Sequence, residues 1–412
     1  MKRSMTDSKV AWIRNIPSSW HMYKNKYLFD KTKDVVGEEW SKTQLLSLTT
    51  SGIKQRSIED VSGKVPESYN GYQLVRPNQI VMCLFDLDCS AVFSGISPLK
   101  GMISPAYIVL NCTDLIDAQF ADYWFRFVFD GRKYNTYSKN IRFSLPYEDF
   151  KEIFTAVPPL SEQKAIVRYL NKKCTAINET MEKHKGIIEE LKEYEQNIIS
   201  KLIYDTRANE IRLKYLGKVQ TGPFGTQLSA DEYVDDGTPC INVKNIKAGY
   251  LSEYDLDMVP DSVLQRLPVH ILQTGDIVFA RKGSVDKHAI VSEKECGWMQ
   301  GSDCIRFRST KKIIPEYLNY ALSASNVKNY LLATANGTTM ATLTSDIIKE
   351  LPIVVPDNNV QGRIADEAYK ITKNVSESIE RKENIISKLE EYKKSIIYHA
   401  VTGKIDCREV QP

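Results

Sequence analysis

A stretch of fifty residues that occurs twice constrains this chain more than any other feature of its sequence. Residues 157–206 read VPPLSEQKAIVRYLNKKCTAINETMEKHKGIIEELKEYEQNIISKLIYDT, and residues 355–404 read VPDNNVQGRIADEAYKITKNVSESIERKENIISKLEEYKKSIIYHAVTGK. The two copies align without a gap, at an offset of 198 residues. Identical residues recur along the whole alignment, among them Gln163 and Gln361, Leu191 and Leu389, and Tyr194 and Tyr392. A repeat of this kind predicts a duplicated architecture.

Each copy has the pattern of one long helix that follows a proline. Apolar residues recur in steps of three and four, and the remaining positions are rich in Glu and Lys. A helix with so narrow an apolar seam needs a partner with the same seam, and the other copy is the obvious one. We therefore predict an antiparallel, intramolecular coiled coil with pseudo-twofold symmetry. Its packing residues are Ile166, Leu170, Ile177, Met181, Ile188, Leu191 and Ile198 in the first copy and Ile364, Ile371, Val375, Ile379, Ile386, Leu389 and Ile396 in the second.

The segments that precede the two helices have the mixed pattern of α+β domains. A chain of 412 residues is too long for one ordinary core. We predict globular domains over residues 1–155 and 207–353, and helical spacers over 156–206 and 354–412. Within the first domain we expect a poorly ordered arm over residues 1–15, a buried helix over 121–129 and a polar loop over 131–143. Within the second we expect a hairpin with strands 277–280 and 289–291, and two helices within 313–335.

Composition excludes several classes of protein. No apolar run approaches the ~20 residues of a membrane span, and the N-terminal residues lack the apolar core of a secretion signal. The eight cysteines form no CxxC pair and the five histidines have no ligand spacing, which favours reduced thiols in the cytoplasm and no metal site. The net charge of +3 does not by itself indicate a nucleic-acid binder. DNA binding would depend on local patches or on partner proteins.

The sequence carries no recognisable catalytic motif. It has no GxxxxGK[ST] phosphate-binding loop, no NPPF/Y tetrapeptide and no glycine-rich motif for S-adenosylmethionine. We therefore expect a non-catalytic chain that binds no cofactor.

Several segments resemble the DNA specificity subunits of type I restriction–modification systems. VPPLSEQKAIVRYL is similar to the start of the central helix of that family, and EEYKKSIIYHAVTGKIDCR (390–408) is similar to its C-terminal region. TGPFGTQL, DDGTPCINVKNIKAGYL and TGDIVFARKGSVDKHAIV resemble one class of target recognition domain, and VRPNQIVMCL with KGMISPAY resembles another. Asp286 departs from the pattern, since a second glycine is expected there.

The resemblance implies a subunit that binds double-stranded DNA at a bipartite, asymmetric site. Each domain would read one half-site, and the helices would act as a spacer. Two methyltransferase subunits would methylate adenine in the site, and two translocating nuclease subunits would carry out restriction. S-adenosylmethionine, ATP and magnesium would belong to those partners. A helix of about 44 residues is about 66 Å long, which corresponds to one to two turns of B-DNA.

Candidate DNA contacts are donors placed on turn-like backbone. Lys and Arg there would position phosphates, and Asn, Gln or Arg would read base edges. In the first domain they are Arg132, Lys133, Tyr134, Asn135, Lys139, Asn140 and Arg142, and in the second Thr226, Gln227, Asn242, Lys244, Asn245, Arg281, Lys282, Ser284 and Lys287. The alternative from another class is a coiled-coil adaptor whose two modules bind something other than DNA.

Overall fold

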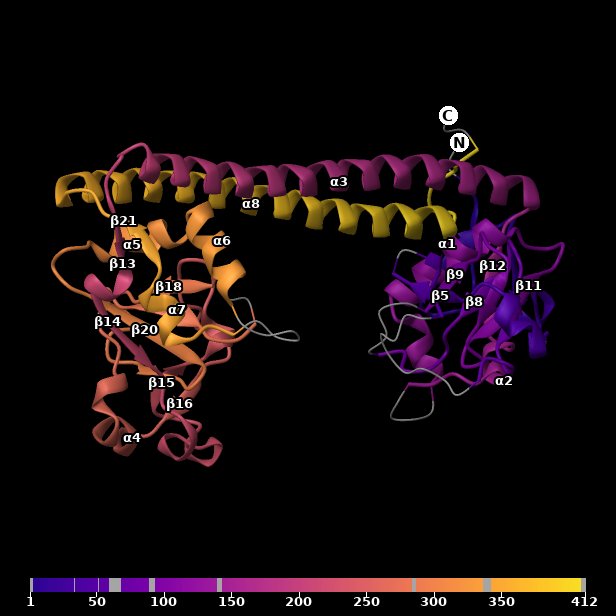
Figure 1. Ribbon diagram of the computed structural model, residues 1–412. Coiled ribbons are helices and arrows are strands. Elements are labelled where there is room, and N and C mark those ends of the chain that lie inside the picture. The colour runs from indigo at the N-terminus through magenta and orange to yellow at the C-terminus, as the bar shows by residue number, and fades with distance from the viewer. Residues whose placement is uncertain are drawn as a thin grey trace. The chain divides into compact units, whose positions relative to one another are not determined.

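A computed structural model of the chain describes residues 3–32, 34–50, 52–58, 68–88, 93–138, 143–283, 287–335 and 342–408. The chain divides into two compact units (Figure 1). Unit 1 comprises Met1–Lys183 and Asn384–Pro412, and unit 2 comprises His184–Glu383. Each unit thus combines α+β structure with part of each of two long helices that join the two domains.

The repeated stretches form these two helices, α3 (Leu160–Tyr204) and α8 (Asn358–Val401). The helix α3 begins two residues after Pro158, and α8 begins two residues after Pro356. The side chain of Asp357 caps α8, because its carboxylate accepts hydrogen bonds from the backbone N–H groups of Asn359 and Val360, both at 3.0 Å. After the end of α8, Gly403 has a φ of +70°, the left-handed conformation that glycine supplies at helix ends.

Within each unit, parts of the two long helices lie side by side and run in opposite directions. In unit 1, Lys393 of α8 donates a hydrogen bond to the side-chain oxygen of Asn178 in α3 at 2.7 Å. In unit 2, Ile203 near the end of α3 shares a core with Ile364 and Ala368 near the start of α8. The late part of one helix therefore meets the early part of the other in both units.

The fourteen predicted packing residues all lie on covered faces of α3 and α8. The buried ones are Ile166, Leu170, Ile177, Met181, Ile188, Ile364, Val375 and Ile396. The half-buried ones are Leu191, Ile198, Ile371, Ile379, Ile386 and Leu389. The predicted seam omitted other buried positions, among them Cys174 and Ile203.

The shorter elements form small sheets with helices against them. Those of unit 1 are β1 (Met5–Asp7), β2 (Asn15–Pro17), β3 (His21–Lys24), β4 (Phe29–Lys31), β5 (Leu46–Thr49), β6 (Gly52–Gln55), β7 (Gln73–Val75), β8 (Ile80–Met82), β9 (Ser94–Ile96), β10 (Gly101–Ile103), β11 (Ile108–Cys112), α1 (Ala118–Asp130), α2 (Tyr147–Phe150) and β12 (Phe154–Val157). Those of unit 2 are β13 (Glu210–Arg212), β14 (Gly217–Thr221), β15 (Thr238–Ile241), β16 (Asp257–Val259), α4 (Asp261–Arg266), β17 (Ile277–Ala280), β18 (His288–Ile290), β19 (Met299–Gln300), β20 (Cys304–Ser309), α5 (Pro315–Leu322), α6 (Ser325–Thr334), α7 (Ser345–Lys349) and β21 (Pro352–Val354).

The largest sheet of unit 1 and that of unit 2 have the same topology. In unit 1 the strand order is β4-β11-β8-β9, and in unit 2 it is β14-β20-β17-β18. All of these neighbours pair antiparallel. In each unit a two-stranded ladder, β3 with β12 or β13 with β21, then leads into a long helix. The duplication therefore extends to the domains, whose sequences show it far less clearly.

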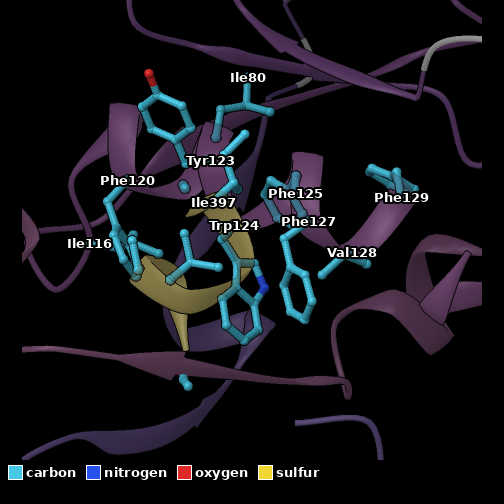
Figure 2. Packing of buried hydrophobic residues seen from close by; sticks show 14 of the residues in the cluster. Ile80, Ile116, Phe120, Tyr123, Trp124, Phe125, Phe127, Val128, Phe129 and Ile397 are labelled. Carbon is cyan, nitrogen blue, oxygen red and sulfur yellow. The ribbon is translucent and has the colours of Figure 1, made fainter. Parts of the chain in front are cut away.

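The helix α1 carries most of the aromatic core of unit 1. Trp124 and Phe125 are both fully buried, and the ring centroid of Trp124 lies 5.9 Å from that of Trp12. Figure 2 shows Ile397 of α8 among these side chains, beside Trp124. The predicted buried helix over 121–129 is thus confirmed. Its side chains pack against α8 in the core of unit 1.

Each unit contains a buried glutamine at the start of a long helix, and the two glutamines make equivalent hydrogen bonds to the backbone. Gln163 is fully buried, accepts a hydrogen bond from the backbone N–H of Asp117 at 2.7 Å and donates to the carbonyl oxygens of Leu115 and Pro158, both at 2.9 Å. Gln361, its partner at the 198-residue offset, accepts from Ile314 N–H at 2.8 Å and donates to the carbonyls of Lys312 (3.3 Å) and Pro356 (2.8 Å). Each glutamine links the start of a long helix to the start of α1 or α5.

Of the other elements expected from the sequence, some are confirmed and one is wrong. The hairpin of β17 and β18 and the two helices α5 and α6 are confirmed. The N-terminal arm is wrong as predicted, because Met5–Asp7 pair with Asn15–Pro17. The region expected as a polar loop over 131–143 contains a 3-10 helix, Lys133–Tyr137, which places Tyr134 in the core. In the part of the chain that the structure describes, no helix has the length and apolar character needed to cross a bilayer.

Candidate nucleic-acid interface

In unit 2, several loops that carry predicted DNA contacts lie against one another. The loop after β14 approaches residues 301–302 so closely that a Cβ on Gly222 would lie 2.0 Å from the carbonyl oxygen of Gly301. A Cβ on Gly301 would lie 2.1 Å from the side-chain oxygen of Asn242, in the turn after β15. Only glycine permits both approaches. The turns after β14, β15 and β19 therefore form one continuous surface.

Arg281, in the turn between β17 and β18, joins this surface through a ring contact. Its guanidinium carbon lies 4.3 Å from the ring centroid of Phe224, which is an exposed aromatic residue in the loop after β14. The backbone of Arg281 is held on both sides, since its N–H donates to Asp303 O at 2.9 Å and its carbonyl accepts from Leu343 N–H at 2.8 Å. A guanidinium stacked on a ring keeps its donor edges free to bind a planar acceptor.

The neighbouring lysines are bound to carboxylates. Lys282 forms an ion pair with Asp303 at 3.1 Å. Lys244 pairs with Asp255 and Asp257, both at 3.0 Å, and the hydrogen bond that its ammonium group donates to Asp255 is the main cause that raises the pKa of Lys244. Their charge is thus largely balanced within the protein.

Asn242 and Asn245 shape the turn after β15. Asn242 donates to Asp257 Oδ2 at 2.7 Å, and its backbone N–H donates to Asn245 Oδ1 at 3.1 Å. Asn245 is fully buried, and its amide donates to the carbonyl oxygens of Ser252 (3.3 Å) and Tyr254 (3.1 Å). We therefore remove Asn245 from the set of proposed DNA contacts, because its polar atoms serve the fold.

Gln227 and Lys287 are exposed, as are the paired lysines Lys244 and Lys282. Gln227 closes its own turn by accepting from Phe224 N–H at 3.2 Å, and no described residue accepts a hydrogen bond from its amide nitrogen. Lys287 directly precedes β18, and its carbonyl accepts from Ala280 N–H at 3.0 Å. Ser284 and Asp286 lie outside the described residues, as does the side chain of Thr226.

In unit 1, the predicted set lies partly in the core. Tyr134 is fully buried, and its hydroxyl accepts from the Asn25 amide at 3.5 Å, so we also remove it from the proposed contacts. Burial raises the pKa of this hydroxyl far above its usual value. Arg132 is exposed and has a positive φ of 48°, while Lys133 and Asn135 are half-buried. Lys139, Asn140 and Arg142 lie outside the described residues.

Phe224, Gly301 and Asp303 contribute to the surface and were missed from sequence. Phe224 lies inside the TGPFGTQL segment, but its side chain has no hydrogen-bond donor, which was the property that defined the predicted contacts. Asp303 is distant in sequence from the residues that it holds, and no local pattern marks it. Within the described ranges, no group of three or more His, Cys, Asp or Glu residues is placed to hold a metal ion.

Known proteins resemble this chain over nearly its full length. Residues 209–391 match the family model described as the type I restriction modification DNA specificity domain. The specificity subunit of the type I restriction enzyme MjaVIII from Methanocaldococcus jannaschii is 23% identical over 428 aligned positions, covering 96% of this chain and 95% of the relative. The EcoKI specificity subunit of Escherichia coli is 23% identical over 282 positions, covering 63% of this chain and 59% of the relative.

A solved structure shows the same fold. It comes from work on complex assembly and conformational transition of the type I restriction–modification system, and the likeness has a TM-score of 0.71 at 13% identity, covering 95% of this chain and 99% of the other. The repeat, the paired helices and the two sheets of equal topology agree with these matches, which favour DNA recognition over the adaptor alternative. Residues 209–391 thus carry the DNA specificity domain of type I restriction–modification systems, and nearly the whole chain is similar to a specificity subunit of such a system.

Proposed function

We propose that this chain reads a bipartite, asymmetric site in double-stranded DNA, one half-site with each unit. The observation that carries the proposal is the equal sheet topology of the two units, combined with unequal loops. Unit 2 presents Arg281 on Phe224, whereas unit 1 presents Arg132 beside a 3-10 turn. Equal frames with unequal reading surfaces suit a site whose halves differ in sequence.

The catalytic steps belong to partner subunits in this proposal. Two methyltransferase subunits that carry S-adenosylmethionine methylate adenines within the site, and two nuclease subunits that use ATP and magnesium carry out restriction. The present chain fixes where they act, and the number of unread base pairs between half-sites follows the length of α3 and α8. The seven described cysteines are free thiols, which suits a cytoplasmic complex.

The test is reconstitution of the chain with its cognate methyltransferase subunit. The complex is given S-adenosylmethionine and a library of random duplex DNA, and methylated positions are read by sequencing. We expect adenine methylation confined to two short sequence blocks separated by a constant gap. Methylation without sequence preference, or a single continuous block, would contradict the proposal.

A further inference from the structure

The 198-residue repeat continues upstream of the long helices into the domains. Leu145 and Leu343, Lys151 and Lys349, and Glu152 and Glu350 are identical pairs at that offset. In both units the lysine forms an ion pair with a carboxylate three residues earlier, Glu148 in unit 1 and Asp346 in unit 2. The segment that leads into each long helix thus has the same chemistry on its surface.

A second short identity lies near the start of each domain. The tripeptide Lys-Tyr-Leu occupies residues 26–28 and 214–216, in each case at the end of a 3-10 turn, Asn25–Tyr27 or Leu213–Tyr215. Both leucines are fully buried, which accounts for their presence. The tyrosines point outward instead, since Tyr27 is 57% exposed and Tyr215 is 63% exposed.

The repeated glutamate forms an ion pair with the lysine of the Lys-Tyr-Leu tripeptide in both units. Glu152 binds Lys24 at 2.7 Å and Lys26 at 3.0 Å. Glu350 binds Arg212 at 2.5 Å and Lys214 at 2.6 Å. The hydrogen bond from Lys24 holds the pKa of Glu152 at about 2, and that from Lys214 lowers the pKa of Glu350.

Each tyrosine ring also lies under a lysine of this cluster. The Nζ of Lys26 is 5.4 Å from the ring centroid of Tyr27, and that of Lys214 is 5.2 Å from the ring of Tyr215. We name each group a tyrosine ledge. Ledge 1 consists of Lys24, Lys26, Tyr27 and Glu152, and ledge 2 consists of Arg212, Lys214, Tyr215 and Glu350.

The two ledges have nearly the same composition, which distinguishes them from surfaces that read DNA sequence. Surfaces that read different half-sites are expected to differ, whereas surfaces that bind the same molecule are expected to agree. Ledge 2 adjoins β13 and β21, since Arg212 ends β13 and Glu350 lies two residues before β21. Within unit 2 these strands lie at the end next to the long helices, and β15 and β16 lie at the opposite end (Figure 1). The ledge is therefore remote from the turn after β15.

The chemistry of a ledge fits a protein partner. Tyr and Arg are the residue types that most often anchor protein interfaces. The carboxylate holds both cations in place, which reduces the side-chain entropy lost on binding. A purely structural role explains the ion pairs, which join the start of each domain to its end, but it does not explain an exposed aromatic ring in both units.

We propose that the two tyrosine ledges are docking points for two copies of one partner protein, the methyltransferase subunit. This inference rests on the proposed function, in which the methyltransferase subunit is present in two copies. Each ledge offers two cations and one carboxylate around an aromatic ring. The complementary surface of the partner is accordingly acidic at its edge and apolar at its centre.

The test counts partner copies in the purified complex without DNA. The full chain is co-purified with its methyltransferase subunit as wild type, Tyr27→Ala, Tyr215→Ala and the double variant, and copies are counted by native mass spectrometry during dilution. We expect two copies for the wild type, one for each single variant and none for the double variant, with affinity at each changed ledge reduced at least tenfold. The charge reversals Lys26→Glu and Lys214→Glu, which retain the ring, are expected to act in the same way.

A matched control is Tyr254→Ala, because Tyr254 is 86% exposed in unit 2 and belongs to neither ledge. This variant should retain two copies, and an unchanged thermal unfolding curve for every variant shows that the fold is intact. Two tightly bound copies in the double variant would overturn the proposal. So would weaker DNA binding at full partner occupancy, which would assign the ledges to phosphates, or loss of self-association, which would assign them to a second copy of this chain. A wild-type chain that binds no methyltransferase subunit would instead contradict the proposed function itself.

Discussion

Unit 1 and unit 2 build the same antiparallel sheet from different side chains. Around the sheet of unit 1 the core is aromatic, with Phe29, Trp124, Phe125 and Phe150 all buried. The corresponding core of unit 2 is largely aliphatic, and Ile348 occupies the place that Phe150 has at the 198-residue offset. Strand order and helix starts are thus retained while core and loops diverge. The frame, meaning the strand order and the helix starts, has therefore been under different constraints from the reading surface.

The largest expected effect follows from replacing the buried glutamine at the start of one long helix at a time. Gln163→Leu leaves one backbone N–H and two carbonyls without partners in unit 1, and Gln361→Leu does the same in unit 2. We expect each variant to destabilise its own unit by about 3 kcal/mol. Hydrogen exchange at the amides of Asp117 and Ile314, which donate to these glutamines, measures the loss.

The exposed Gln265 supplies the matched control for this pair. Gln265→Leu should leave exchange at both amides unchanged. Equal loss of protection in both units after a single glutamine substitution would show that the two frames are not independent.

The divergence of the cores is tested by a reciprocal exchange. Phe150→Ile removes a ring that lies 6.3 Å from Phe29 and 6.1 Å from Phe125, measured between centroids, and leaves a cavity. Ile348→Phe overfills a fully buried site. We expect each to reduce the free energy of unfolding of its unit by roughly 1–2 kcal/mol. Denaturant titration followed by hydrogen exchange distinguishes the units, and a neutral result for either change would mean that the cores are interchangeable.

The reading surfaces are tested through Arg281. Arg281→Ala should weaken binding to the cognate site about tenfold, or ~1.4 kcal/mol, with the loss confined to one half-site. Arg266→Ala is the matched control and should leave the affinity unchanged, because Arg266 is paired with Glu232 and is not among the candidate contacts. Affinities are measured at constant salt on duplexes with either half-site scrambled. An equal loss on every sequence would instead place Arg281 on a phosphate.

The smallest expected effect concerns the ion pairs of ledge 1. Its paired cations, Lys24 foremost, hold the pKa of Glu152 at about 2, so folding favours the charged carboxylate. This stabilisation is present above the ordinary pKa of 4.5 and is lost as the pH falls from there towards 2. Glu152→Gln should therefore lower Tm slightly at neutral pH, by about one or two degrees, and not at pH 2. A difference that persists unchanged at pH 2 would contradict this origin.

The helical frame was accessible from sequence because its signals are local and periodic. The seam positions Ile166 and Ile364, like the rest of the stripe, recur every three or four residues. The 198-residue offset then identifies Gln163 with Gln361. The buried role of these glutamines was not predicted, since their partners, Asp117 and Ile314, lie more than forty residues upstream. Glu152 and Glu350 are also identical at this offset, upstream of the fifty-residue repeat, so their equivalence was accessible from sequence.

The candidate interface was less accessible because it depends on contacts between distant loops. Arg281 and Lys282 are adjacent in sequence, yet one stacks on Phe224 and the other is paired with Asp303. Tyr134 and Asn245 have the polar groups of contact residues, and only the tertiary structure shows that those groups are used inside the protein. A pattern of donors in one sequence does not distinguish an available donor from an occupied one.

We propose that one duplicated frame carries two independent reading units. It is tested most directly by replacing residues 207–353 with the corresponding domain of another specificity subunit and sequencing the methylated sites of the reconstituted complex. We expect one half-site to change, while the other half-site and the gap between them stay the same. A change in both half-sites, or in the gap alone, would contradict it.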